Sequence, residues 1–166
     1  MSVFDGYTVV TTVDVPEAAY DEQGHLNNVA VLRLFEQLRR QYMLGAGQLR
    51  REMLPDGLVV GVREMVCSYV TEAMPTEELR GGCRVLGRTN RSYLFDEILA
   101  AVPTVGSSGR SSGERVVARA RVLECVIDRA AGRAVVIPAE FWSVFERLEG
   151  RAMPPGTLPF PRTDWD

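Results

Sequence analysis

Residues Val29 to Tyr42 read VAVLRLFEQLRRQY, and their pattern is the clearest indication of the fold. Its apolar residues recur at intervals of three and four, which is the spacing of one face of an α-helix. The residues on this face are Val31, Leu34, Phe35, Leu38 and Tyr42. The sequence therefore predicts a long amphipathic helix that packs one side against the rest of the domain.

Flanking residues define the ends and the polar face of this helix. The side-chain oxygen of Asn27 or Asn28 can accept a backbone N–H at its start, and glycines at positions 45 and 47 end it. The polar face carries four residues, namely Arg33, Glu36, Gln37 and Arg40. Glu36 and Arg40 are spaced for an i,i+4 ion pair.

The rest of the chain has the composition of strands rather than helices. Valine-rich or threonine-rich segments are predicted as strands over Tyr7–Val15, Leu58–Thr71, Glu78–Arg88, Tyr93–Val102, Arg115–Ile127 and Arg133–Ile137. Turn residues separate them, including the glycine- and serine-rich run GSSGRSSG at 106–113, which predicts a flexible hairpin loop. Pro138 predicts the start of a short helix that continues to about Leu148.

One of these segments alternates clearly. Between Arg115 and Ile127, the apolar residues Val116, Ala118, Ala120 and Val122 alternate with Arg119 and Arg121. This pattern predicts an antiparallel strand with one face in the core and the other in solvent.

The order of elements points to an α+β domain. One strand, one long helix and about five further strands predict a curved antiparallel sheet wrapped around a central helix. We expect a single domain over residues 1–149 and an irregular, proline-rich tail over 150–166.

Composition excludes several classes of function. The 166 residues are 46% apolar and 25% charged, with a net charge of −3, so disorder and a global basic field for nucleic acid are not expected. All 19 basic residues are arginine, so no lysine can form a Schiff base. One histidine and three scattered cysteines (Cys67, Cys83, Cys125) predict neither a metal site nor disulfides, only reduced thiols. Without a signal peptide or a long apolar segment, we expect a cytoplasmic protein.

The segment just before the helix concentrates the chemistry. It reads DEQGHLNN from Asp21 to Asn28 and holds a carboxylate, a glycine, the only histidine and three amides. A helix N-terminus offers free N–H groups to an oxyanion, and a nearby carboxylate can act as a base or a nucleophile. An ordinary polar loop with a helix cap would have the same composition, so the residues alone leave both interpretations open.

This segment resembles the signature of hotdog-fold thioesterases. The matching pattern is Asp21-x-x-Gly24-His25-x-Asn27-Asn28 followed by Leu32-x-x-Phe35-Glu36-x-x-Arg39, and weaker similarity runs through nearly the whole chain. It is similar to the hydroxybenzoyl-CoA thioesterase group and to plant-type acyl-carrier-protein thioesterases. The resemblance implies the hotdog fold, which agrees with the fold predicted above.

The resemblance also implies roles for individual residues. Asp21 lies where the hydroxybenzoyl-CoA group keeps its catalytic aspartate, and Gly24 would offer its N–H to the thioester carbonyl. Asp21 and His25 match the spacing of the plant-type enzymes, but Gln23 stands where those enzymes have asparagine. His25, Gln23 or Asn27 would then hold the water and the loop.

Four further candidates lie outside the loop. Glu36 is a second candidate carboxylate, since related enzymes use a helix glutamate, although it can equally be a surface partner of Arg40. Arg88, Arg91 and Ser92 lie in a hairpin where the family often places basic residues near the nucleotide of coenzyme A; a solvated hairpin tip is the other interpretation.

We therefore expect an acyl-thioester hydrolase acting on acyl-CoA or acyl-carrier-protein substrates without a metal or redox cofactor. A dehydratase on the same fold and a non-catalytic acyl-CoA-binding module are the alternatives. Because a single curved sheet leaves its edge strands open, we expect a homodimer or a tetramer in which the partner completes the substrate pocket. Nucleic acid and membrane are not expected partners.

Overall fold

The computed structural model describes residues 1–45, 54–103 and 113–160. Its elements are β1 (Val9–Thr12), a short 3-10 helix (Glu17–Ala19), α1 (Asn28–Gly45), β2 (Leu58–Tyr69), β3 (Glu78–Arg88), β4 (Ser92–Val102), β5 (Arg115–Asp128), β6 (Arg133–Ala134) and α2 (Ala139–Glu149). The predicted long helix and strands are confirmed, with the first and last strands shorter than expected. Most of the predicted GSSGRSSG loop lies outside the described residues.

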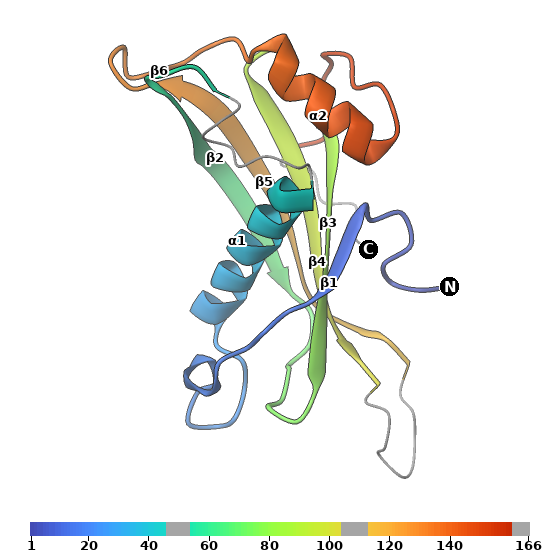
Figure 1. Ribbon diagram of the computed structural model, residues 1–166. Helices are drawn as coiled ribbons and strands as arrows, with labels where there is room; N and C mark the ends of the chain where they lie inside the picture. The colour runs from blue at the N-terminus through green and yellow to red at the C-terminus, as the bar shows by residue number, and fades with distance from the viewer. Residues whose placement is uncertain (46–53, 104–112, 161–166) are drawn as a thin grey trace.

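The strands form one antiparallel sheet in the order β1-β3-β4-β5-β2, with β6 paired to β5. Helix α1 lies across one face of this twisted sheet, and α2 lies beside the end where β3 turns into β4 (Figure 1). This is the predicted hotdog architecture, a curved sheet with a long helix packed on it. Strands β1 and β2 are the two edges.

The core lies between α1 and the sheet. Phe35, Leu38 and Tyr42 of the helix are fully buried, as their spacing predicted. Helix and sheet approach closely at Gly81 of β3, where a Cβ atom would overlap the Cδ2 atom of Leu38. Glycine is therefore needed at this position to admit the leucine side chain.

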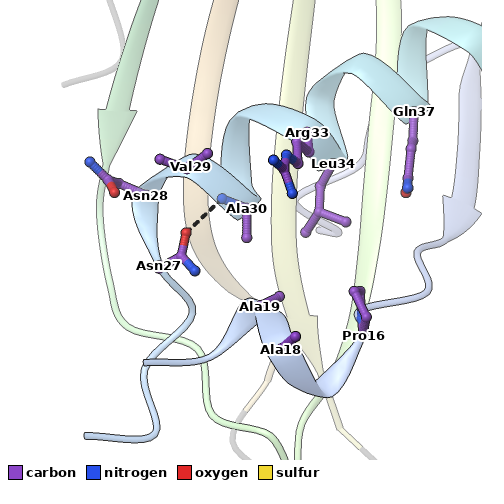
Figure 2. A pocket seen from close by; sticks show the side chains of 10 residues that line it. All are labelled: Pro16, Ala18, Ala19, Asn27, Asn28, Val29, Ala30, Arg33, Leu34 and Gln37. Carbon is purple, nitrogen blue, oxygen red and sulfur yellow. Dashed lines mark hydrogen bonds between the residues drawn. The ribbon is translucent and has the colours of Figure 1, made fainter. Parts of the chain in front are cut away.

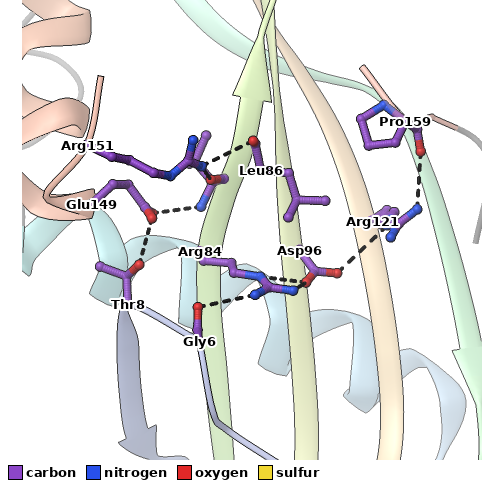
Figure 3. Close-up of polar contacts among 10 residues, drawn as sticks. Gly6, Thr8, Arg84, Leu86, Asp96, Arg121, Glu149, Arg151 and Pro159 are labelled. Atoms are coloured by element: carbon purple, nitrogen blue, oxygen red, sulfur yellow. Dashed lines mark hydrogen bonds and ion pairs between the residues drawn. The ribbon is translucent and has the colours of Figure 1, made fainter. Parts of the chain in front are cut away.

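The outer face of β5 differs from the prediction. Arg121 is buried instead of solvated: it faces Asp96, with Nε and Oδ1 3.8 Å apart, and donates to the Pro159 carbonyl at 3.2 Å (Figure 3). Val116 also packs on this outer face, because an irregularity in the β4–β5 pairing shifts the alternation there. The expected half-solvated strand was wrong because the C-terminal segment and the first residues of the chain cover this face.

Glu149 connects the end of α2 to three other elements. Its carboxylate accepts a hydrogen bond from Thr8 Oγ1 at 2.7 Å (Figure 3). It also accepts hydrogen bonds from Tyr42 Oη at 2.6 Å and from the Val85 N–H at 2.8 Å. Burial, together with the bond to Glu149, raises the pKa of Tyr42 well above its ordinary value. Beyond Glu149, residues 151–160 contain no helix, and the buried Met153 anchors them. None of the helices in the described ranges has the length and apolar character required to cross a membrane.

Candidate active site

The loop before α1 is closed by its own hydrogen bonds. The Asp21 N–H donates to the His25 carbonyl and the Gly24 N–H donates to the Asp21 carbonyl, both at 2.9 Å. Gly24 has a φ of 80°, a conformation that favours glycine. A further backbone bond, from Leu26 to the Ala73 carbonyl at 3.0 Å, fixes the loop to the segment after β2.

The Asp21 side chain both shapes this loop and remains accessible. Its Oδ1 accepts the backbone N–H groups of Gln23 and His25, each at 2.9 Å. The residue is exposed, and its second oxygen, Oδ2, makes no hydrogen bond within the described part of the chain. One carboxylate oxygen therefore holds the turn while the other is available for chemistry.

Backbone N–H groups near the start of α1 differ in whether they are already hydrogen-bonded. The Gly24 N–H already bonds the Asp21 carbonyl, so in this conformation it does not face a substrate. Asn27 caps the helix: its Oδ1 accepts the Ala30 N–H at 2.8 Å (Figure 2), and its carbonyl accepts the Val31 N–H at 3.2 Å. The N–H groups of Asn28 and Val29 are left without a partner among the described residues, so they are free to donate to a ligand at the helix start.

His25 lies on the side of the loop that faces β2. Its Nε2 is 3.4 Å from Oε2 of Glu72, a residue that sequence reasoning missed. Nothing in the sequence marks Glu72, because it lies about 50 residues away and is brought near only by the backbone bond at Ala73. Gln23 is exposed beside them at the tip of the loop.

Two pockets flank the first turn of α1. One has a volume of about 620 Å³ and lies between the helix and the segment Pro16–Ala19; Figure 2 shows its lining, which includes Asn27, Asn28 and Val29. The other, of about 260 Å³, lies on the β2 side and is lined by residues that include His25, Tyr69 and Glu72. Asn28 and Val29, which carry the free N–H groups, line the larger pocket, and Val31 of the same helix lines the smaller one.

Glu36 is separated from this loop. It lies two turns along α1, where the helix rise places it about 12 Å from Asn28. Its Oε1 accepts a hydrogen bond from Arg40 at 2.7 Å, which matches the interpretation as a surface ion pair. It lines a third pocket, of about 300 Å³, with Val60 and Val62 of β2.

The predicted nucleotide-binding residues lie at the opposite end of the sheet. The length of β4 separates Ser92 from the loop end by about 30 Å. Arg88 is already engaged, because its guanidinium lies 4.6 Å from the Trp142 ring and donates to the Met153 carbonyl at 2.5 Å. Ser92 Oγ is 2.8 Å from Thr89 Oγ1, and Arg91 is exposed at the tip of the hairpin.

A buried charged cluster behind the helix was also missed. Arg39 donates to Glu97 at 2.6 Å and lies 3.2 Å from Glu124, which accepts the Tyr93 hydroxyl at 2.7 Å. All three charged residues are nearly inaccessible to solvent. The available signal was the position of Arg39, four residues after Phe35 and three before Tyr42, which places it on the apolar face of α1.

The charged residues of the described segments do not form a metal centre: no three His, Cys, Asp or Glu side chains of residues 1–45, 54–103 and 113–160 gather closely enough to hold an ion. The three cysteines are free thiols. Burial raises the pKa of Cys83 well above its ordinary value, as expected for a structural thiol.

Comparison with known families agrees with the fold described above. Residues 15–145 match the family model of the thioesterase-like superfamily. The chain therefore belongs to the thioesterase-like superfamily. A search of curated protein sequences finds no match to it.

Several solved structures share this fold. A thioesterase from Thermus thermophilus, complexed with coenzyme A and zinc, is 22% identical over 89% of this chain and 99% of its own, with a TM-score of 0.70. A 4-hydroxybenzoyl-CoA thioesterase, an aspartate-to-asparagine mutant bound to 4-hydroxybenzoyl-CoA, is 15% identical over 82% and 97%, with a TM-score of 0.70. A 1,4-dihydroxy-2-naphthoyl-CoA thioesterase from Synechocystis is 11% identical over 82% and 93%, with a TM-score of 0.68.

Proposed function

We propose that this chain hydrolyses acyl thioesters of coenzyme A or acyl carrier protein, with Asp21 as the catalytic carboxylate. The observation that carries the proposal is a loop that holds a carboxylate with one free oxygen and ends in two free backbone N–H groups at a helix start. Acyl transfer requires both kinds of group: a base or nucleophile, and preorganised donors for the carbonyl oxygen.

The reaction follows from these groups. The N–H groups of Asn28 and Val29 bind the thioester carbonyl oxygen and stabilise the negative charge that develops on it. Asp21 Oδ2 either takes a proton from an attacking water or itself attacks the carbonyl carbon to form an anhydride that water then opens. Either route breaks the C–S bond, transfers a proton to the thiolate, and gives a free acid and a free thiol.

Each of the two pockets beside the helix start holds a different part of the substrate. The acyl group occupies the larger pocket, whose walls are mostly small apolar side chains such as Ala18, Ala19 and Ala30. The thiol arm leaves through the smaller pocket past His25 and Tyr69. His25 and Gln23 orient water and the loop, and Glu36 remains a second candidate carboxylate. No metal or redox group takes part, and coenzyme A or phosphopantetheine enters only as part of the substrate.

A homodimer completes the site in this proposal. Among the described strands β2 is an edge, with β5 as its one neighbour. Val62 and Tyr69 of β2, and Val70 directly after it, are each more than half exposed. Pairing of two β2 edges about a two-fold axis would cover these side chains and make one continuous sheet. Because that pairing is antiparallel, it would also bring the partner's Arg91 hairpin toward the loop end of this subunit, which resolves the separation of about 30 Å within one chain.

A turnover assay with a panel of acyl-CoA and acyl-carrier-protein thioesters tests the proposal through detection of free thiol. Release of thiol from at least one class of thioester is expected. Tight binding of acyl-CoA with no release would identify a binding module instead, and loss of water from a hydroxyacyl thioester without thiol release would identify a dehydratase.

A further inference from the structure

The larger pocket contains one charged side chain that the thioester reaction does not use. Among the described residues that line it, only Arg33 is charged. Within the described part of the chain Arg33 makes no ion pair, whereas Arg40 on the same helix is paired with Glu36 at 2.7 Å. An arginine without a carboxylate partner, at the wall of a cavity, offers a planar set of donors to an anionic group.

The pocket has a polar end and an apolar middle. Figure 2 shows Arg33, Leu34 and Gln37 along its helix side. The opposite wall is formed by Pro16, Ala18 and Ala19, whose side chains are short. The volume of about 620 Å³ lies within the range of small-molecule sites.

Distances along the helix relate this polar end to the reacting carbonyl. The rise of α1 places Arg33 about 7 Å and Gln37 about 13 Å from the free N–H of Asn28. The bond from the Ala30 N–H to its side-chain oxygen holds the Asn27 side chain at the helix start, away from Arg33 and Gln37 along the helix. An acyl group bound at the helix start would therefore run past Ala30 and Leu34 and end beside Arg33 and Gln37.

From this arrangement we infer that the chain selects acyl groups with a carboxylate at the far end, the monothioesters of dicarboxylic acids. This inference rests on the proposed function and specifies its substrate class. The Arg33 guanidinium binds the distal carboxylate, the Gln37 amide donates a further hydrogen bond, and the apolar middle of the pocket holds the methylene chain. A methyl terminus would leave the guanidinium without a partner and gain no charge-assisted bond.

A matched pair of substrates tests this selection. Adipyl-CoA and hexanoyl-CoA have the same number of carbons and differ only in a terminal carboxylate or methyl group. We expect kcat/KM of the native chain to be at least about tenfold higher for adipyl-CoA. We expect Arg33→Gln to lower the ratio of the two kcat/KM values at least about tenfold, and Arg33→Lys to restore part of it.

Arg129→Gln is the matched control. It removes the same charge from an exposed position next to β6, at the other end of the sheet, so the ratio should stay at its native value. Pantetheine thioesters of the same two acids distinguish the source of the anion. If Arg33 bound a phosphate of coenzyme A instead, Arg33→Gln would impair both CoA substrates equally and neither pantetheine substrate.

The outcomes distinguish selection of a distal carboxylate from thioester hydrolysis itself. Turnover of hexanoyl-CoA with an unchanged ratio in Arg33→Gln overturns the inference and leaves the proposed function intact. Failure of the native chain to release thiol from any thioester overturns the proposed function, and the inference with it.

Discussion

The Oδ1 atom of Asp21 accepts the backbone N–H of His25 at 2.9 Å, and the same oxygen accepts the N–H of Gln23 at the same distance. A single carboxylate oxygen thus closes the loop that carries the candidate catalytic group. Structure and chemistry at Asp21 can be separated experimentally, because asparagine retains an acceptor oxygen whereas alanine does not.

The first prediction concerns the stability of this loop. Asp21→Ala removes the acceptor for two backbone N–H groups and should lower the free energy of unfolding by about 1–2 kcal/mol. Asp21→Asn should unfold close to the native temperature, since its amide oxygen can take the place of Oδ1. Thermal denaturation of the three proteins measures this, and equal destabilisation by both substitutions would contradict the assigned bonds.

The second prediction concerns the hairpin. Arg91→Ala should raise KM for CoA thioesters with little change in kcat, because a phosphate contact far from the carbonyl binds ground and transition states alike. High salt should have the same effect on the native chain. Arg88→Ala should instead lower Tm, since it removes the contacts to Trp142 and the Met153 carbonyl. A KM insensitive to Arg91→Ala and to salt would show that the hairpin is only a solvated tip.

The third prediction concerns the helix–sheet contact. Gly81→Ala places a Cβ atom in overlap with the side chain of Leu38, which is fully buried and cannot move aside, so it should cost about 1–3 kcal/mol of stability. Gly113→Ala is the control, because a Cβ atom there has no neighbour within 4 Å. Chemical denaturation of both variants gives the comparison; a Gly81→Ala variant as stable as the control would refute the close approach.

The fourth prediction concerns assembly. Val62→Glu introduces a charge on the β2 edge, and in a β2-paired dimer the two copies would repel each other and be desolvated. We expect it to shift the chain toward monomer in sedimentation and to reduce specific activity, and we expect native activity to fall on dilution. Val136→Glu alters an equally exposed valine away from that edge and should leave both unchanged. A fully active native monomer would contradict this.

The fifth prediction concerns acid. Partial burial acts to raise the pKa of Glu77, but hydrogen bonds from Arg115 and the Met74 N–H outweigh it and hold the pKa below the ordinary value of 4.5. A lowered folded-state pKa stabilises the fold above about pH 4.5 and loses that contribution as pH falls through the folded-state value. Tm of the native chain should therefore fall more steeply below this pH than Tm of Glu77→Gln. Parallel curves for the two proteins would be the contrary result.

Residue spacing predicted the buried face of α1 but not the covered outer face of β5. The spacing of Phe35, Leu38 and Tyr42 predicted α1 and its buried face, because local patterning determines helices directly. The solvated face predicted for β5 was wrong at Arg121, since chain termini that cover a sheet leave no mark in the strand itself.

The site was predicted in its composition but not in its contacts. The loop from Asp21 to Asn28 was identified from residue types and resemblance, and the structure places it at the start of α1 as expected. Sequence could not show that the Gly24 N–H is already bonded or that Glu72 faces His25, because both depend on how the backbone closes. The roles of these residues stay predictions.

The catalytic role of Asp21 is tested by the rate at which Asp21→Asn releases free thiol from the best thioester substrate of the native chain. Because the substitution retains the loop and removes only the base or nucleophile, the account predicts a fall in kcat of at least about two orders of magnitude at unchanged Tm. A folded Asp21→Asn variant with near-native kcat would contradict the account and transfer the catalytic role to another carboxylate, with Glu36 the first to examine.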